Sequence, residues 1–181
     1  MSIFIQNLKA DILMVRGCEN NRFSDILFII HPRVLPVLLV RTASLLGRWH
    51  LGPIAKVISF LNQILFGCDI ARNAQIAGGL YLPHPVGVVV GESAVLGKNT
   101  ILHQGVTLGA RGEEHEGSDP ILSDYIEVGT GAKLLGHIKV GKYARIGANS
   151  VVLKDIDDFG IVVGIPAKLI GYREDKESLQ G

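Results

Sequence analysis

The sequence predicts a three-sided parallel β-helix preceded by a short α-helical region. From residue 70 onward an Ile, Leu or Val recurs every six residues, and not at the period of 2 or 3.6 that marks an ordinary strand or helix. A small or β-branched residue often stands four positions after the aliphatic one. Ile, Leu and Val make up 59 of the 181 residues, whereas aromatic residues make up 6%. A core of this composition is aliphatic and finely stacked.

The helical region is expected to cover residues 1–66. Ser24 can cap a short helix that runs through Ile30. A second helix is expected over residues 34–48, and Pro53 can begin a third helix that ends at Phe66. Helices this apolar need burial on several sides, against one another or against another subunit.

An alternative interpretation of these helices is a peripheral membrane face, with Arg41, Arg48 and Lys56 near the lipid headgroups. No run of roughly 18–20 uninterrupted apolar residues is present, so a membrane-spanning helix is not expected. We therefore expect a cytoplasmic protein, with the inner face of the membrane as the alternative location. The formal net charge is +1, which disfavours nucleic-acid binding.

The six-residue ladder is the strongest signal in the chain. Its members are Ile70, Ile76, Leu82, Val90, Leu96, Leu102, Leu108, Leu122, Val128, Leu134, Val140, Ile146 and Val152. In a three-sided coil each hexad makes one short strand and a turn, so that three hexads, eighteen residues, complete one coil. Each aliphatic side chain then points into the prism and stacks on its equivalent in the next coil. We assign residues 67–165 to this β-helix and residues 166–181 to a C-terminal tail.

A glycine follows the aliphatic position in many hexads. We interpret these glycines as the corners at which the backbone turns tightly.

Two breaks interrupt the ladder, and breaks in a solenoid are where function tends to be placed. The step from Leu82 to Val90 is eight residues instead of six. The step from Leu108 to Leu122 is fourteen residues instead of twelve, and residues 109–121 are therefore expected to form a protruding loop.

His84 lies at the first break, between two prolines that restrict its backbone, and is the candidate general base. Asp69 precedes it by fifteen residues, five-sixths of a coil, so the two side chains can meet on neighbouring coils. A carboxylate beside an imidazole stabilises the imidazolium that forms when the ring takes a proton. The alternative is that Asp69 only ends the preceding helix or caps the first coil.

Several motifs in this order resemble the serine acetyltransferase family, which belongs to the left-handed β-helix, hexapeptide-repeat acyltransferases. The resemblance covers about residues 50–170. It is carried by CDI at 68–70, YLPHPVG at 81–87, VVVGE at 88–92, LHQGVTLG at 102–109 and GIPAK at 164–168.

The resemblance implies the left-handed coil and an Asp69–His84 dyad that activates a hydroxyl to attack acetyl-CoA. It also implies a homotrimer with active sites between subunits, in which CoA lies in the groove between two prisms. No metal is expected. The residues implied to hold CoA are Gly109, Ala110, Arg111, Thr130, Ala132, Ala148 and Lys168. A solvated tail is the alternative for Lys168.

The acceptor side departs from the family. The residues expected there are Pro83, Glu92, Ser118 and Asp119. Pro83 replaces an Asp that holds serine in the family, and Ser118 and Asp119 replace an Arg-His pair that grips its carboxylate. An ionised Asp119 facing the acceptor would repel a carboxylate. This pattern resembles the short acetyltransferases that modify capsule and exopolysaccharide sugars.

The sequence therefore predicts an acetyl-CoA-dependent O-acetyltransferase acting on a polysaccharide sugar or its precursor. The main alternative is a serine O-acetyltransferase of cysteine biosynthesis. Two further alternatives are a zinc hydratase using His84, His103 and His137, which would leave Asp69 unexplained, and a purely structural trimer.

Overall fold

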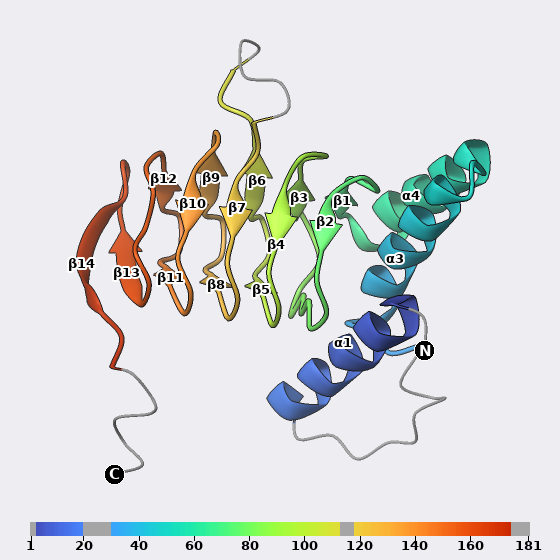
Figure 1. Ribbon diagram of the computed structural model, residues 1–181, viewed down its shortest axis with the longest axis horizontal. Coiled ribbons are helices and arrows are strands. Elements are labelled where there is room, and N and C mark those ends of the chain that lie inside the picture. The colour runs from blue at the N-terminus through green and yellow to red at the C-terminus, as the bar shows by residue number, and fades with distance from the viewer. Residues whose placement is uncertain (1–2, 20–29, 113–117, 175–181) are drawn as a thin grey trace.

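The computed structural model describes residues 3–19, 30–112 and 118–174. In these residues helices α1 (Ile3–Glu19), α3 (Leu35–Arg48) and α4 (Gly52–Phe66) lie at one end of a prism of short strands (Figure 1). The first seven strands are β1 (Asp69–Ile70), β2 (Gln75–Ile76), β3 (Val89–Val90), β4 (Val95–Leu96), β5 (Ile101–Leu102), β6 (Thr107–Gly109) and β7 (Ile121–Leu122). The others are β8 (Glu127–Val128), β9 (Lys133–Leu135), β10 (Lys139–Val140), β11 (Arg145–Ile146), β12 (Val151–Val152), β13 (Gly160–Val163) and β14 (Lys168–Tyr172).

The strands form three walls, as the hexad period predicts. Sheet A has the order β1-β3-β6-β9-β12, sheet B the order β10-β7-β4-β2, and sheet C the order β14-β13-β11-β8-β5. Neighbouring strands are parallel except β13 and β14. Successive strands along the chain from β1 to β13 therefore belong to different walls, and each coil stacks on the one before it.

The ladder residues fill the interior of the prism. Twelve of the thirteen are buried, at 5% exposure or less, and Ile76 is partly buried against them. The small residues four positions later, including Ala94, Thr100 and Ser150, are also buried. The predicted inward stacking is confirmed.

Five of the six glycines that directly follow a ladder position leave no room for a Cβ atom, and none of the six has a positive φ angle. Positive φ angles occur instead at other corner positions, including Gly105, Gly131 and Asn149. At Gly97 a Cβ atom would lie 2.5 Å from the carbonyl carbon and oxygen of Ser123 on the next coil. The close approach of neighbouring coils therefore excludes a side chain there.

Both ladder breaks appear in the strand register. Asp69 pairs with Val89, a step of twenty residues instead of eighteen, which accommodates the His84 bulge. Val95 pairs with Ile121, a step of twenty-six residues. The second break thus inserts eight extra residues between strands of adjacent walls. The sequence predicts only two extra residues, because there the step of fourteen is compared with two hexads and not with one.

The C-terminal boundary also differs from the prediction. Lys168–Tyr172, placed in the tail, forms β14 and pairs antiparallel with β13, so that it covers the end of sheet C.

Helix α1 and helix α3 are joined to the first coil by a buried ion pair between Asp11 and Arg41. The Asp11 carboxylate accepts hydrogen bonds from Arg41 Nε and Nη2 and from the backbone N–H groups of Gly79 and Leu80, at 2.5–2.9 Å. Arg41 also donates to the carbonyls of Ile76 and Ala77, at 3.1 and 2.7 Å. Arg41 therefore cannot contact lipid headgroups, and this part of the membrane hypothesis is wrong.

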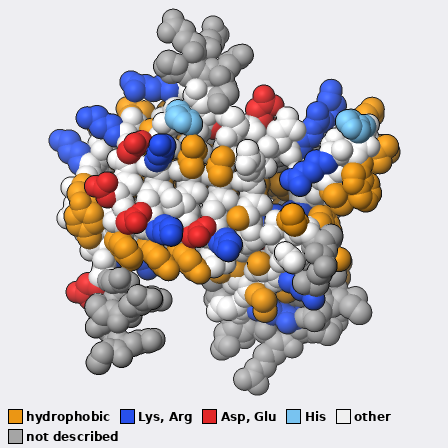
Figure 2. All heavy atoms as spheres, viewed as in Figure 1, with side chains coloured by type: hydrophobic (Ala, Val, Ile, Leu, Met, Phe, Trp, Pro, Cys, Tyr) orange, Lys and Arg blue, Asp and Glu red, His pale blue; other side chains and the backbone are white. Residues whose placement is uncertain are grey.

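Helix α4 presents an apolar surface to solvent. Ile54, Val57, Phe60, Leu61, Ile64 and Leu65 are each 44–64% exposed. Figure 2 shows apolar side chains gathered over the helical end, with Lys and Arg side chains beside them. No described helix is long and apolar enough to cross a membrane. The short helix predicted over 24–30 lies almost wholly outside the described residues.

Candidate active site

His84 lies on the bulge that enlarges the first coil. The preceding wall ends with a parallel bridge between Tyr81 and Ile101, after which the chain runs through Pro83 and Pro85 to Gly87. Gly87 has a φ of 73°, and its N–H donates to the carbonyl of Gly67 at 2.7 Å. The His84 side chain is exposed at this corner. It is thus available to a ligand outside the prism.

Asp69 begins β1 directly after the helical region. Helix α4 ends at Phe66 and is capped by Gly67, which has a left-handed φ of 64° and donates to the carbonyl of Gln63 at 2.9 Å. The Asp69 side chain is exposed and forms no helix cap or other hydrogen bond within the described part of the chain. This observation disfavours a capping role for Asp69.

The two candidate catalytic segments lie side by side. The Asp69 N–H donates to the carbonyl of Val88 at 2.8 Å, and β1 pairs with β3, the strand that follows the bulge. Within the described residues no direct hydrogen bond or ion pair joins Asp69 to His84. The dyad stays a prediction, supported by the backbone pairing of the two segments.

The edge that carries the His84 bulge continues along the later coils. Backbone N–H groups of Gly105, Gly131 and Asn149 donate to the carbonyls of Val86, Gln104 and Thr130, at 2.7–3.0 Å. The His84 bulge is therefore the first step of a column of corners between sheets C and A. Lys133 Nζ donates to the carbonyl of Gly105 on this column.

The residues predicted to hold CoA lie in different parts of the prism. Thr130 and Ala148 lie on the same edge as His84, half-buried and exposed respectively. Gly109 ends β6, and Ala110 and Arg111 follow it at the opposite margin of sheet A. Lys168 is exposed on β14.

The structure contradicts the expectation that the Ala132 side chain contacts CoA. Its side chain is fully buried and belongs to the aliphatic core. The hexad period explains this, because Ala132 occupies the small-residue position that faces the interior. Its side chain cannot contact CoA.

The expectation for Asp119 is also wrong. Asp119 is 5% exposed, and its carboxylate accepts hydrogen bonds from the N–H and hydroxyl of Ser93, at 2.9 and 2.8 Å. The carboxylate therefore anchors the returning loop to the prism, and it does not face an acceptor. Ser118 beside it is half-buried.

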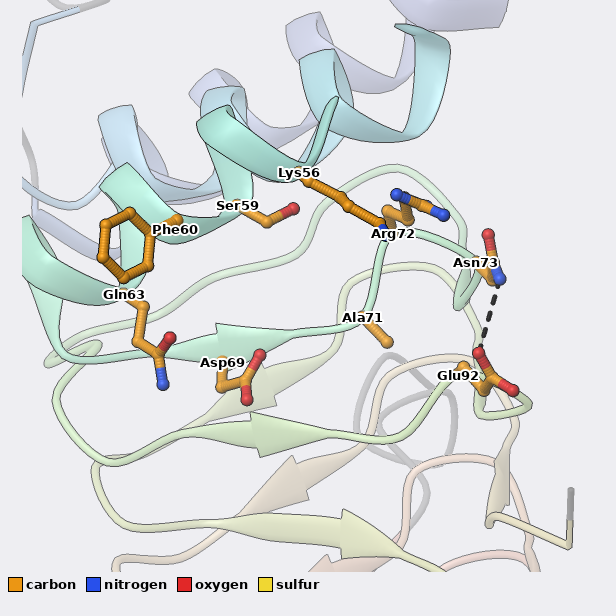
Figure 3. Close-up of a pocket in the computed structure, with 9 residues that line it drawn as sticks. All are labelled: Lys56, Ser59, Phe60, Gln63, Asp69, Ala71, Arg72, Asn73 and Glu92. Carbon is orange, nitrogen blue, oxygen red and sulfur yellow. Dashed lines mark hydrogen bonds between the residues drawn. The ribbon is translucent and has the colours of Figure 1, made fainter. Parts of the chain in front are cut away.

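The junction between α4 and the first coil contains a cavity of about 340 Å³ (Figure 3). It is lined by Lys56, Ser59, Phe60, Gln63, Asp69, Ala71, Arg72, Asn73 and Glu92. Glu92, expected near the acceptor, accepts a weak hydrogen bond of 3.4 Å from Asn73. Pro83 is half-buried on the adjacent bulge and does not line the cavity.

Lys56 and Arg72 are the charged lining residues that the sequence does not identify as site residues. The sequence suggests a membrane face for Lys56, and no motif distinguishes Arg72. Their convergence depends on how α4 docks on the prism, which no spacing in the sequence encodes.

Cys68, the neighbour of Asp69, faces the other way. Burial raises the pKa of the Cys68 thiol to about 11. It is 1% exposed, so the thiol is a core group and not a nucleophile at this site.

The other histidines offer no metal site in the described ranges. His103 Nε2 lies 3.5 Å from the Glu127 carboxylate, which also pairs with Arg145. No group of three or more His, Cys, Asp or Glu side chains there could hold a metal ion.

Comparison of the sequence with known proteins identifies relatives of this chain. No protein-family model matches the chain. A serine acetyltransferase of Synechococcus elongatus is 39% identical over 145 residues, covering 80% of this chain and 59% of the relative. The serine acetyltransferase of Bacillus subtilis is 42% identical over 117 residues, covering 65% and 54%. The chain thus spans between half and three-fifths of the length of these curated relatives.

Solved structures agree over nearly the whole chain. Serine acetyltransferase from Brucella abortus in complex with coenzyme A superposes with a TM-score of 0.86 at 31% identity, over 94% of this chain and 69% of that one. Soybean serine acetyltransferase complexed with serine gives 0.85 at 34% identity, over 93% and 70%. The fold is the left-handed parallel β-helix with N-terminal helices, and the chain belongs to the serine acetyltransferase-like family of hexapeptide-repeat acyltransferases.

Proposed function

We propose that this protein is an acetyl-CoA-dependent O-acetyltransferase in which His84 is the general base. One observation carries the proposal: the pairing of β1 with β3 brings Asp69 and the His84 bulge to one edge of the prism. The family includes a member whose structure holds coenzyme A, and this supports a thioester as the donor.

His84 would remove the proton from an acceptor hydroxyl as its oxygen attacks the carbonyl carbon of the acetyl thioester. The carbon–sulfur bond then breaks, and the imidazolium returns the proton to the leaving CoA thiolate. Asp69 would stabilise the imidazolium between the two steps. Backbone N–H groups near the bulge would stabilise the oxyanion of the tetrahedral intermediate.

We place CoA along the edge that carries His84, Thr130 and Ala148, with Gly109, Ala110 and Arg111 on the facing side of a neighbouring subunit. A single convex prism offers no deep groove along this edge, whereas two parallel prisms form one. Lys168 is a cation available to the CoA phosphates. The active form in this proposal is a homotrimer, with a mass near three times 19.5 kDa.

Serine is the acceptor that the comparisons favour, because the relatives quoted above are serine acetyltransferases. This reverses the order of the two acceptors predicted from the sequence. The argument against serine from Asp119 no longer holds, since that carboxylate is buried against Ser93.

A saccharide hydroxyl is the second candidate, and Pro83 is the observation that favours it. In the resembled family an Asp at this position holds serine, and Pro83 has no side chain that can hydrogen bond. The Arg-His pair of the family is also replaced by Ser118 and the buried Asp119.

The test measures acetyl-CoA consumption with L-serine, glucose and galactose, for the wild type and for His84→Ala. We expect His84→Ala to lower kcat by at least about 10²-fold, since a positioned general base contributes about 10²–10⁴-fold. The matched control is His137→Ala, because His137 is another exposed histidine, and on the described chain it has no partner.

Each outcome bears on a different part of the proposal. Full turnover by His84→Ala would show that His84 is not the general base. A monomer that retains activity would show that a groove between subunits is not needed. Serine turnover at about 10 s⁻¹, typical of metabolic enzymes, would establish serine and exclude the saccharide. Turnover with a sugar alone would reverse that choice.

A further inference from the structure

The cavity between α4 and the first coil carries an arrangement of charge that the general base does not explain. Lys56, Ser59, Phe60 and Gln63 line it from α4 at the spacing i, i+3, i+4, i+7, so they share one face of the helix. Asp69 and Arg72 line it from the first coil. The cavity therefore opens between α4 and the first coil.

Two cations, Lys56 and Arg72, line the cavity together with the carboxylates of Asp69 and Glu92. Lys56 and Arg72 form no hydrogen bond or ion pair with any described residue. Figure 3 shows the Lys56 side chain extending toward Arg72, above the strand that carries Asp69. Neither cation is ion-paired with Asp69 or Glu92, so their N–H groups are available to an anionic group that enters the cavity.

The Arg72 side chain packs against α3. It is half-buried, and its Cδ and Nε lie 3.6 and 3.8 Å from where a Cβ at Gly47 of α3 would be. The arginine stem thus rests on the helix where no side chain intervenes. A guanidinium oriented in this way can bind a carboxylate or phosphate with two hydrogen bonds.

The position of the cavity favours an acceptor over CoA as its occupant. It lies on the first coil beside Asp69, whereas the residues expected to hold CoA, such as Ala148 and Lys168, lie on later coils. An anion bound by Arg72 would leave the rest of its molecule close to Asp69, which lines the same cavity.

We infer that Lys56 and Arg72 bind an anionic group, a carboxylate or a phosphate, of the molecule whose hydroxyl is acetylated at His84. The inference rests on the proposed acetyl transfer and narrows its acceptor to anionic hydroxyl compounds. It also supplies a cationic site for the acceptor at a place other than residues 118 and 119.

The experiment compares three pairs of acceptors that differ in one anionic group. They are L-serine and L-serinamide, methyl β-D-glucuronoside and methyl β-D-glucoside, and glycerol 3-phosphate and glycerol. We expect the anionic member of at least one pair to have a kcat/KM about 10- to 100-fold higher, as charged hydrogen bonds provide. The pair concerned identifies the source: an amino acid, an acidic sugar or a phosphate ester.

The double variant Lys56→Gln/Arg72→Gln should lose this preference while its KM for acetyl-CoA stays unchanged. Arg72→Lys, which keeps the charge but loses the planar fork, should retain part of it. The control is Lys98→Gln, an exposed lysine whose side chain has no partner on the described chain. Circular dichroism checks that each variant is folded.

Equal rates within every pair, a preference that survives the double variant, or an effect confined to the KM for acetyl-CoA would overturn the inference. If no acceptor is turned over, calorimetry with serine, the glucuronoside and glycerol 3-phosphate decides the matter. Binding that depends on Lys56 and Arg72 would then retain the anion site and reject the acetyl transfer. Absence of binding to the wild type would reject the site.

Discussion

Replacing Asp11 by Ala should detach the helical region from the prism. Asp11 and Arg41 are 1% and 8% exposed, and Asp11 accepts four hydrogen bonds. Removing one partner of a buried ion pair costs about 3–5 kcal/mol, because the other charge stays buried and unpaired. The backbone N–H groups of Gly79 and Leu80 also lose their acceptor, at about 1–3 kcal/mol each where water cannot reach them.

Water that enters the space left by the Asp11 side chain can solvate both Arg41 and the two backbone N–H groups, so the two costs are not fully additive. We therefore expect a loss of about 4 kcal/mol in the free energy of unfolding. Asp11→Asn should lose less, because its amide oxygen still accepts from a backbone N–H. The double variant Asp11→Leu/Arg41→Met should be more stable than Asp11→Leu alone, because it leaves no buried charge.

Urea unfolding followed by circular dichroism measures these differences, at one protein concentration because subunit association contributes to stability. Hydrogen exchange reports separately on α1 and α3. The control is Asp155→Ala, since exposed Asp155 accepts one hydrogen bond from the Lys139 N–H at 2.8 Å and should cost about 1 kcal/mol or less. An Asp11→Ala protein within 1 kcal/mol of the wild type, with unchanged exchange in α1, would refute the reasoning.

Three more predictions test the prism and its neighbourhood. Gly97→Ala should lower the free energy of unfolding by about 2 kcal/mol or more, because its Cβ would lie 2.5 Å from Ser123, whereas Gly171→Ala has open space and should change little in the same urea assay. Asp119→Ala should cost about 2 kcal/mol by losing both Ser93 bonds, and Asp119→Asn should not raise kcat/KM for serine; a specific gain there would mean that the carboxylate faces the acceptor. In a Cys18→Ser background, Cys68 should resist iodoacetamide at pH 8 until the protein is unfolded, and rapid labelling of the native protein would contradict its burial. Because folding raises the pKa of the Cys68 thiol from 9.0 to about 11, its contribution to stability is complete below pH 9 and is lost as the pH rises through 11.

The sequence by itself determined the prism. Each coil contacts only its neighbours, so the inward side chains repeat along the chain with the period of the walls. Leu82, Leu102 and Val128 are all fully buried, as that period requires. The first break located the His84 bulge for the same reason, because two extra residues can leave the ladder only by projecting from it.

The tertiary structure decided what the period does not encode. Whether a glycine serves a turn or a close approach depends on the next coil, as Gly97 shows. The direction of the Asp119 side chain depends on Ser93, twenty-six residues earlier on the adjacent coil. The convergence of Lys56, Arg72 and Asp69 on one cavity depends on the angle at which α4 docks on the first coil. That angle is set by packing between a helix and a wall with unrelated periods, and so it leaves no repeat in the sequence.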